Sequence, residues 1–280
     1  MKSFSFFKYS GAGNDFILIE KSNNENITFN TKEITKLCAR RTGIGADGVL
    51  LFSDSDTSDF CVEYYNADGS TGMLCANGAR CSIFHAAKSR SKDFKLLNFS
   101  ANGKNYSGKV IEDKIVRLNL NPPSGLKRNI VVEFDGKKLI GDFIDTGSPH
   151  LVIDTGSKEF HSAVGDILEN LDADLLGSKI RNLEMFAPVG VNVNFLEISS
   201  DSIKVRTFEK GVEAETLASG TGTVATGIIA SLKYKLVPPL DIITGGGIKM
   251  KVDFTLENDT INNVSLTGPV DLVYRGEFFI

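Results

Sequence analysis

The sequence predicts an α+β fold of two similar halves, each with a β-sheet wrapped round a central helix. Short runs that alternate apolar and polar residues, as half-buried strands do, recur along the whole chain. Long helical patterns are few, and those at residues 76–88 and 220–233 are apolar enough to lie inside a sheet layer. Similar short strings precede both of these helices, which indicates a weak internal repeat.

The elements are expected in the following order. Strands are predicted at residues 4–9, 15–20, 48–52, 60–65, 115–120, 130–134, 138–144, 150–153, 191–198, 202–208, 248–254 and 263–274. Helices are predicted at residues 31–39, 76–88, 159–170 and 220–233. The string NPPSGLKR at residues 121–128 carries two prolines and a glycine, so it is predicted to be a linker.

The repeat rests on two pairs of motifs that occur in the same order. GNDFILI at residues 13–19 is similar to GSPHLVI at residues 147–153. Cys75 then opens the string CANG before one apolar helix, and Ser219 opens SGTG before the other. The shared order favours a repeat over chance. Two such halves are expected to face each other across a cleft.

Composition excludes several classes of function. Of the 280 residues, 41% are hydrophobic and 24% are charged, which is typical of a soluble globular protein. A net charge of -4 without a basic block argues against nucleic acid. We find no apolar run near the roughly 20 residues of a membrane helix, and no signal peptide. A cytoplasmic protein without membrane attachment is expected. Four cysteines and three histidines form neither a disulfide scaffold nor a metal pattern.

Cys75 is the strongest candidate for chemistry. At a helix N-terminus, the dipole and the unpaired N–H groups stabilise a thiolate. The same N–H groups can bind a carboxylate. A thiol beside a bound α-carboxylate suits the abstraction of an α-proton. Ser219 begins the second helix, where an ordinary N-cap is the simpler interpretation because serine is a preferred capping residue.

Seven blocks in order resemble diaminopimelate epimerase, and they span nearly the whole chain. They are SGAGNDF (10–16), RTGIGADG (41–48), NADGSTGMLCANGARC (66–81), TGSPHLV (146–152), GVNVNF (190–195), RTFEKGVEAETLASGTG (206–222) and TGPVDLVYRG (267–276). The resemblance implies two pseudo-symmetric halves with the active site in the cleft between them. Residues 1–120 plus 268–280 would form the half with Cys75, and residues 121–267 the half with Ser219.

The resemblance also implies the reaction and its residues. In the family, two cysteines act on opposite faces of one α-carbon, without pyridoxal phosphate, other cofactor or metal. The partner would be a small-molecule amino acid, and the family often forms homodimers. Cys75 and Ser219 take the catalytic positions. The α-carboxylate would bind at Ala76, Asn77, Gly78, Gly220 and Thr221, and the remaining substrate-binding positions are Asn14, Asn66, Ser148, His150, Asn192, Glu209 and Lys210.

The chain departs from the family pattern at four positions. Ser219 replaces the second cysteine, and a hydroxyl ionises far less readily than a thiol of pKa near 8.5. Ser219 is then either an introduced substitution or a natural residue with changed chemistry. Lys210 stands where the family has an arginine that is expected to bind the distal carboxylate. A lysine keeps the positive charge but cannot form the two parallel hydrogen bonds of an arginine. In the family, the position of Ser148 is often occupied by asparagine, and the position of Ala76 is usually occupied by glycine.

Three hypotheses about function follow. The leading one is an epimerase that interconverts LL- and meso-diaminopimelate and is impaired by Ser219. The second is a racemase of another amino acid, for which Lys210 and Ser148 argue. The third is a one-base or non-epimerising relative of the same fold, for which Ser219 argues.

Overall fold

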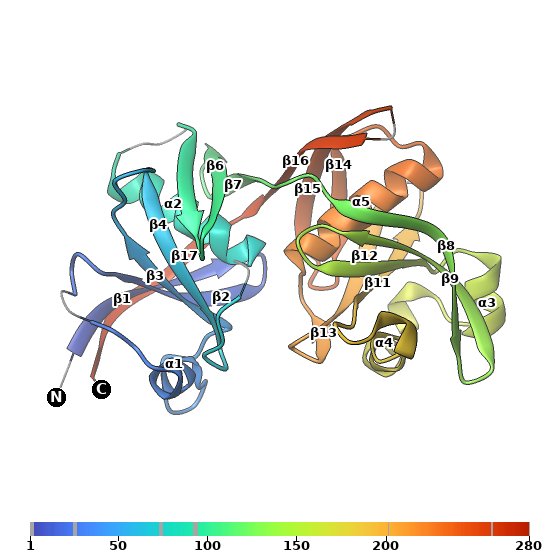
Figure 1. Cartoon of the computed structure of the whole chain (residues 1–280), viewed down its shortest axis with the longest axis horizontal. Coiled ribbons are helices and arrows are strands. Elements are labelled where there is room, and N and C mark those ends of the chain that lie inside the picture. The colour runs from blue at the N-terminus through green and yellow to red at the C-terminus, as the bar shows by residue number, and fades with distance from the viewer. Residues whose placement is uncertain are drawn as a thin grey trace. The chain divides into compact units, whose positions relative to one another are not determined.

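The computed structural model describes residues 3–24, 27–72, 75–91, 95–200, 202–258 and 260–279. The chain folds into two compact units (Figure 1). Unit 1 comprises Met1–Leu120 together with Thr267–Ile280, and unit 2 comprises Asn121–Leu266. Within the described ranges, no helix combines the length and the apolar character needed to cross a lipid bilayer.

Unit 1 is a mixed sheet that carries both ends of the chain. Its strands are β1 (Ser3–Gly11), β2 (Asn14–Glu20), β3 (Gly48–Ser53), β4 (Phe60–Asn66), β5 (Leu97–Ala101), β6 (Lys104–Glu112), β7 (Ile115–Asn119) and β17 (Asp271–Phe279). They pair in the order β17-β1-β2-β3-β4-β5-β6-β7. The pairs β2–β3 and β4–β5 are parallel, and the others are antiparallel.

Helix α2 (Ala76–Ser89) is the core of unit 1. Every residue from Ala76 to Ala87 is buried, including the polar Asn77, Arg80 and His85. The helix packs against β1 and against β7, which lie far apart in the strand order, so the sheet curves round it. Gly11 in β1 permits the close approach, because a Cβ there would lie 2.7 Å from the Asn77 carbonyl oxygen. Helix α1 (Thr31–Cys38) covers the other face of the sheet through Ile34 and Leu37.

Unit 2 repeats this plan. Its strands are β8 (Ser124–Phe134), β9 (Lys137–Asp145), β10 (Pro149–Asp154), β11 (Asn192–Ile198), β12 (Ile203–Glu209), β13 (Ala214–Thr216), β14 (Leu240–Thr244) and β15 (Lys249–Glu257). They pair in the order β8-β9-β10-β11-β12-β14-β15, and β13 adds to β12. Strand β16 (Thr260–Pro269) carries the chain from unit 2 into unit 1.

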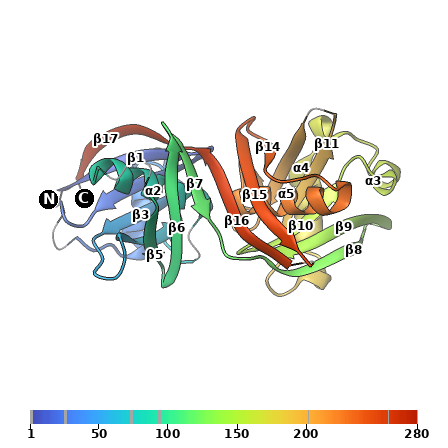
Figure 2. The ribbon, with the colours of Figure 1, turned by 90° about the horizontal axis from the view of Figure 1, so that it is seen from above.

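Helix α5 (Gly220–Tyr234) is the core of unit 2. It packs against β9, β10, β11, β12, β14 and β15, and Figure 2 shows it among these strands. Its residues from Gly222 to Ser231 are all buried. Helices α3 (Lys158–Ala163) and α4 (Ala173–Arg181) pack on the outer face, together with the 3-10 turns η1 (Leu168–Asn170) and η2 (Glu184–Phe186).

The two units share one order of strand pairings. In unit 1, β1 to β6 pair as antiparallel, parallel, antiparallel, parallel and antiparallel. In unit 2, the series β9, β10, β11, β12, β14 and β15 repeats that alternation. Each central helix follows the fourth strand of its series, directly or after the short β13. The predicted α+β class, with two pseudo-symmetric halves each built round a helix, is confirmed.

Two expected elements were wrong. The helix predicted at residues 159–170 ends at Ala163, because Gly165 adopts a φ of 83° that a right-handed helix cannot contain. The linker predicted at residues 121–128 is a strand from Ser124 onward, paired with β9. Its irregular register at Ser124/Lys127 accommodates Gly125 at φ 65°, and this bulge hid the alternation expected of a strand.

Other elements were missed or merged. The single strand predicted at residues 263–274 is two strands, β16 and β17, separated at Val270. Strands β5, β6, β13 and β14 and helix α4 were not predicted. Helix α4 has an N-cap that the sequence could have shown, because the Asp172 side chain accepts from the Leu175 N–H.

Candidate active site

Cys75 is the N-cap residue of α2. Its backbone is extended, with φ -61° and ψ 128°, and its side chain makes no capping hydrogen bond to the first turn. The thiol is half-buried. The first helical residues, Ala76, Asn77 and Gly78, are buried behind it. The N–H groups at the start of a helix have no acceptor within the helix, so this end of α2 suits an anion.

Ser219 is the N-cap residue of α5 and occupies the equivalent position in unit 2. Its backbone is also extended, with φ -104° and ψ 118°. Unlike Cys75, it caps its helix, because its Oγ accepts from the Gly222 N–H at 3.3 Å. The residue is only 4% exposed. The ordinary N-cap considered from the sequence is therefore present, at the position where the family places a second cysteine.

In unit 1, two of the expected substrate-binding amides are joined. The Asn77 Nδ2 donates to Asn14 Oδ1 at 2.6 Å, so the start of α2 is tied to the start of β2. The Arg80 guanidinium donates to Asn77 Oδ1 at 2.8 Å. Arg80 is fully buried, and this desolvation lowers its pKa to about 10, although the Cys81 and Cys75 thiols oppose the shift. A buried positive charge therefore acts close to the Cys75 thiol.

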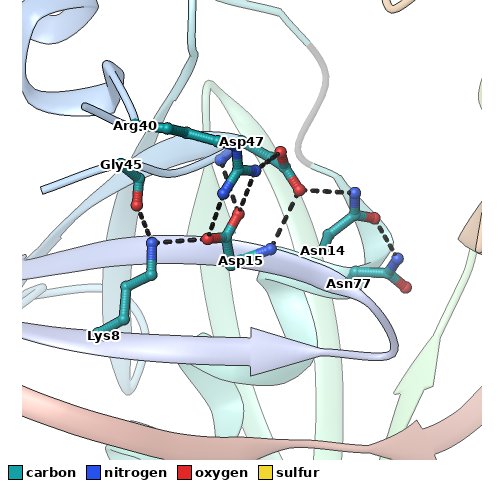
Figure 3. Close-up of polar contacts among 7 residues, drawn as sticks. All are labelled: Lys8, Asn14, Asp15, Arg40, Gly45, Asp47 and Asn77. Atoms are coloured by element: carbon teal, nitrogen blue, oxygen red, sulfur yellow. Dashed lines mark hydrogen bonds and ion pairs between the residues drawn. The ribbon is translucent and has the colours of Figure 1, made fainter. Parts of the chain in front are cut away.

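The Asn14 amide is held on its other side by a carboxylate. Its Nδ2 donates to Asp47 Oδ2 at 3.0 Å, and the Asp15 N–H donates to the same oxygen at 3.1 Å (Figure 3). Arg40 donates to Asp47 Oδ1 at 2.6 Å and binds both oxygens of Asp15. Lys8 forms an ion pair with Asp15 at 2.7 Å. The network therefore runs from the exposed Arg40 to the buried face of α2.

Opposing effects act on the Asp15 carboxyl in this network. Burial alone would raise its pKa, but hydrogen bonds and charges from Arg40 and Lys8 outweigh burial and lower the pKa. Asp15 is therefore an ionised structural anchor. It is not a proton donor near neutral pH.

Asn66 lies at the end of β4 in a different set of contacts. Its Oδ1 accepts from the Tyr64 hydroxyl at 2.8 Å, and its Nδ2 donates to Ser70 Oγ at 3.0 Å. Its backbone N–H donates to the Ser70 carbonyl, which closes the turn after β4. Asn66 is thus oriented by its own turn. The pair Asn14 and Asn77 is oriented by the network around Asp47.

In unit 2, His150 lies in a cluster of hydroxyls. Its Nε2 lies 2.9 Å from Thr221 Oγ1 and 3.0 Å from Ser148 Oγ. Its Nδ1 lies 3.1 Å from Asn194 Nδ2. His150 is fully buried, and desolvation lowers its pKa to about 3, with the nearby charge of Lys210 acting in the same direction. His150 is therefore neutral at physiological pH and cannot serve as a proton reservoir there.

Asn192 connects two other expected site residues. Its Oδ1 accepts from the Lys210 backbone N–H at 2.8 Å. Its Nδ2 donates to the Pro149 carbonyl at 2.9 Å and approaches Ser148 Oγ at 3.3 Å. The side chain therefore holds the end of β12 against the start of β10. Both of its N–H donors face protein acceptors.

Within unit 2, hydrogen bonds join several of the expected residues. Ser148, His150, Asn192 and Thr221 form one connected cluster. Glu209, another expected substrate-binding residue, accepts through its Oε2 from Thr216 Oγ1 at 3.1 Å, on the neighbouring strand β13.

Three residues that shape the site were missed from the sequence. Asn194 orients His150, Asp47 orients Asn14, and Arg80 holds Asn77. Asn194 had a usable signal, because Asn192 and Asn194 are two apart and lie on one face of a strand. Asp47 and Arg80 are in the quoted blocks RTGIGADG and CANGARC, but only the fold shows what they contact.

Metal ligands are a separate question. Within the ranges that the structure describes, no group of three or more histidine, cysteine or carboxylate side chains is placed to hold a metal ion. The polar groups of the site are amides, hydroxyls and N–H donors. Such groups suit the carboxylates of an amino acid.

Comparisons with known proteins agree with this geometry. Residues 6–119 match the family model described as diaminopimelate epimerase. The diaminopimelate epimerase of Chlorobaculum tepidum is 38% identical over 275 residues, covering 95% of this chain and 98% of the relative. That of Aquifex aeolicus is 37% identical and covers 97% and 96%.

Solved structures share the fold at low identity. A PhzF-family phenazine biosynthesis protein from Bacillus anthracis aligns with a TM-score of 0.72 at 14% identity, over 100% of both chains. A probable proline racemase from Agrobacterium radiobacter aligns with a TM-score of 0.73 at 12% identity, over 99% of this chain and 93% of the other. These likenesses show the fold alone. The much closer full-length sequence relatives decide the family, and the chain belongs to the diaminopimelate epimerase family.

Proposed function

We propose that this protein is a cofactor-independent epimerase that interconverts LL- and meso-diaminopimelate. The observation that carries the proposal is Cys75 at the N-cap position of the buried helix α2, in a chain 38% identical to a diaminopimelate epimerase over almost its full length. Other relatives of that name, at 37% and 32% identity, favour the same substrate over a different amino acid.

The proposed chemistry is a proton transfer at one α-carbon. The substrate α-carboxylate accepts hydrogen bonds from N–H groups at the start of α2. In one direction, the Cys75 thiolate removes the α-proton, and the resulting negative charge spreads into the carboxylate, where these N–H dipoles stabilise it. A proton from the residue at position 219 then reaches the opposite face and inverts the centre. In the reverse direction, the Cys75 thiol is the donor.

Ser219 limits this reaction. The abstraction from its face would require an alkoxide, which forms far less readily than a thiolate. Its Oγ also accepts the Gly222 N–H, which ties the hydroxyl to the helix cap. We therefore expect slow epimerisation by the chain as it stands. The same substrate should be converted much faster when position 219 is a cysteine.

The distal end of the substrate needs a cation. The Lys210 ammonium is the candidate, and Asn192 fixes its backbone by accepting the Lys210 N–H. A lysine offers a point charge to the distal carboxylate, where arginine would offer two parallel hydrogen bonds. We propose the free amino acid as the only partner needed for turnover. A homodimer and a cytoplasmic location remain predictions, to be checked by analytical ultracentrifugation and cell fractionation.

The test is a direct conversion assay. Purified protein and its Ser219→Cys variant are incubated with LL-diaminopimelate, and chiral chromatography separates the isomers with time. Formation of the meso isomer supports the proposal, and Cys75→Ala in the same background should abolish it. If the Ser219→Cys variant leaves diaminopimelate unchanged but racemises another amino acid in a panel, the proposed substrate is wrong.

A further inference from the structure

Two side-chain amides of unit 1 lie in a chain of hydrogen bonds whose ends differ in character. Arg80 donates to Asn77 Oδ1 at 2.8 Å, and Asn77 Nδ2 donates to Asn14 Oδ1 at 2.6 Å. Asn14 Nδ2 then donates to Asp47 Oδ2 at 3.0 Å. One end of the chain is a cation and the other is an anion. The bonds between them all run in the same direction.

These ends decide how the amides are oriented. A guanidinium can only donate, so it must meet the oxygen of Asn77, and the nitrogen of Asn77 must then face Asn14. An ionised carboxylate can only accept, so Asp47 must meet the nitrogen of Asn14. An amide turned by 180° has nearly the same shape, and packing alone cannot select its orientation. The two charged ends select it.

We propose that Asp47 and Arg80 are positioning residues that fix the Asn14 amide with its nitrogen ready to bind a carboxylate oxygen of the substrate. An amide nitrogen carries two N–H donors, one of which goes to Asp47. The other donates to the bound amino acid. This inference rests on the proposed function for the identity of that ligand. The orientation of Asn14 itself does not depend on it.

Asp47 is itself held in place by three contacts. Its Oδ1 accepts from Arg40 at 2.6 Å, its Oδ2 accepts from the Asp15 N–H, and its own N–H donates to the Asp15 carbonyl at 2.9 Å. Figure 3 shows Asp47 between Arg40 and Asn14, with Asp15 beneath. Arg40 is 61% exposed in its side chain, whereas Arg80 at the other end is fully buried. Of the two ends of this hydrogen-bond chain, Asp47 is therefore the one that can be substituted without disturbing the buried core.

The experiment compares variants in the Ser219→Cys background. Asp47→Asn removes the acceptor-only group and lets the Asn14 amide turn. Because a binding contact is lost in both ground and transition states, we expect KM for diaminopimelate to rise about tenfold or more, while kcat changes little. Lys114→Gln is the control, since it removes one positive charge of unit 1 from an exposed ion pair with Asp271 outside this network. Its KM should stay close to that of the parent.

A swapped pair separates positioning from stability. The double variant Asn14→Asp with Asp47→Asn keeps the net charge. The carboxylate at position 14 can accept from the Asn77 amide, and the amide at position 47 can donate to that carboxylate. The melting temperature should rise above that of Asp47→Asn, although the Asp15 N–H still lacks the oxygen that accepts it in the parent. KM should stay high, because Asp at position 14 has no N–H for the substrate. A KM that recovers together with the melting temperature would show that Asp47 acts only on stability.

A second readout does not need turnover. Side-chain amide signals of Asn14 are recorded by 15N NMR in the ligand-free protein and identified by their loss in Asn14→Asp. We expect two well-separated proton shifts in the parent, and altered or broadened signals in Asp47→Asn but not in Lys114→Gln. Unchanged Asn14 signals in Asp47→Asn would overturn the inference. If the parent fails to convert diaminopimelate while these signals change as expected, the proposed function fails and the positioning role stands.

Discussion

The side-chain nitrogen of Asn194 lies 3.1 Å from Nδ1 of His150. The same nitrogen donates to the Leu151 carbonyl at 3.2 Å. The side-chain oxygen of Asn194 accepts from the Thr207 hydroxyl at 3.0 Å. These two contacts fix the orientation of the Asn194 amide. Nδ1 must therefore accept, and the proton of the neutral imidazole lies on Nε2. His150 consequently donates toward the hydroxyls of Thr221 and Ser148.

This arrangement predicts a loss of stability in acid. The folded-state pKa of His150 is lowered to about 3, whereas an unfolded histidine titrates near 6.5, so the unfolded state binds more protons between these values. The free energy of unfolding should fall as the pH drops below 6.5, by up to about 1.4 kcal/mol per pH unit from this group. Urea denaturation from pH 8 to pH 4 measures the slope.

Two variants isolate the contribution of His150 from those of other groups. His150→Gln removes the titration and should give a shallower acid slope, with lower stability at pH 8 because the hydroxyl cluster is disturbed. The control is His161→Gln at an exposed position, and its acid slope should be steeper than that of His150→Gln. Equal slopes for wild type and His150→Gln would mean that His150 is not held neutral in the fold.

Changing Ser219 should affect activity and stability in opposite directions. Ser219→Cys supplies the second thiol and should raise epimerisation about 10²–10⁴-fold, the usual contribution of a general acid–base group. It also replaces the oxygen that accepts the Gly222 N–H, so stability should fall. Ser219→Ala is the control, because it should lose about 0.5–2 kcal/mol of stability without any gain in rate. Thermal unfolding and isomer analysis measure both effects.

Lys210→Arg should improve binding of the distal carboxylate. A guanidinium can form two parallel hydrogen bonds where the ammonium provides a point charge, so KM for diaminopimelate should fall about 3–10-fold. The inhibition constant for lysine, which lacks the distal carboxylate, should not fall. If the KM for diaminopimelate and the inhibition constant for lysine both fall, Lys210 lies near the α-carboxylate instead.

Gly11→Ala should destabilise unit 1. A Cβ at Gly11 would lie 2.7 Å from the Asn77 carbonyl oxygen and 2.9 Å from the Cys81 Sγ, so β1 and α2 would have to separate. The expected cost is about 1–3 kcal/mol of unfolding free energy. Gly72→Ala is the matched control, because the nearest atom there, Asn66 Nδ2, is 3.8 Å from the added carbon. Comparable losses in the two variants in guanidinium denaturation would contradict this packing.

The sequence predicted the two central helices because both segments are long and largely apolar. It also predicted the repeat, because Cys75 and Ser219 each begin one of these helices. It failed where a single glycine or proline pair controls the local structure. Gly165 ends the helix α3 early, and the two prolines before Ser124 disguised the start of β8.

The contacts that orient the site residues lay beyond sequence reasoning. Asn194 and His150 are 44 residues apart, and Asn14 and Asp47 are 33 apart. Asn194 and His150 meet because parallel pairing sets His150 opposite Asn192, two residues from Asn194 on the same face. Such register depends on the whole sheet. A reading of short motifs can name the polar residues, but it cannot predict which of them meet.

Deuterium incorporation at the α-carbon tests the central claim most directly. LL- and meso-diaminopimelate are each incubated in D2O with the Ser219→Cys variant and with the unchanged chain, and NMR follows label and configuration together. Two-base epimerisation predicts that the variant places deuterium in the inverted isomer first, in both directions, while the unchanged chain does so far more slowly. Label that enters without inversion, or no label with either isomer, would contradict the account.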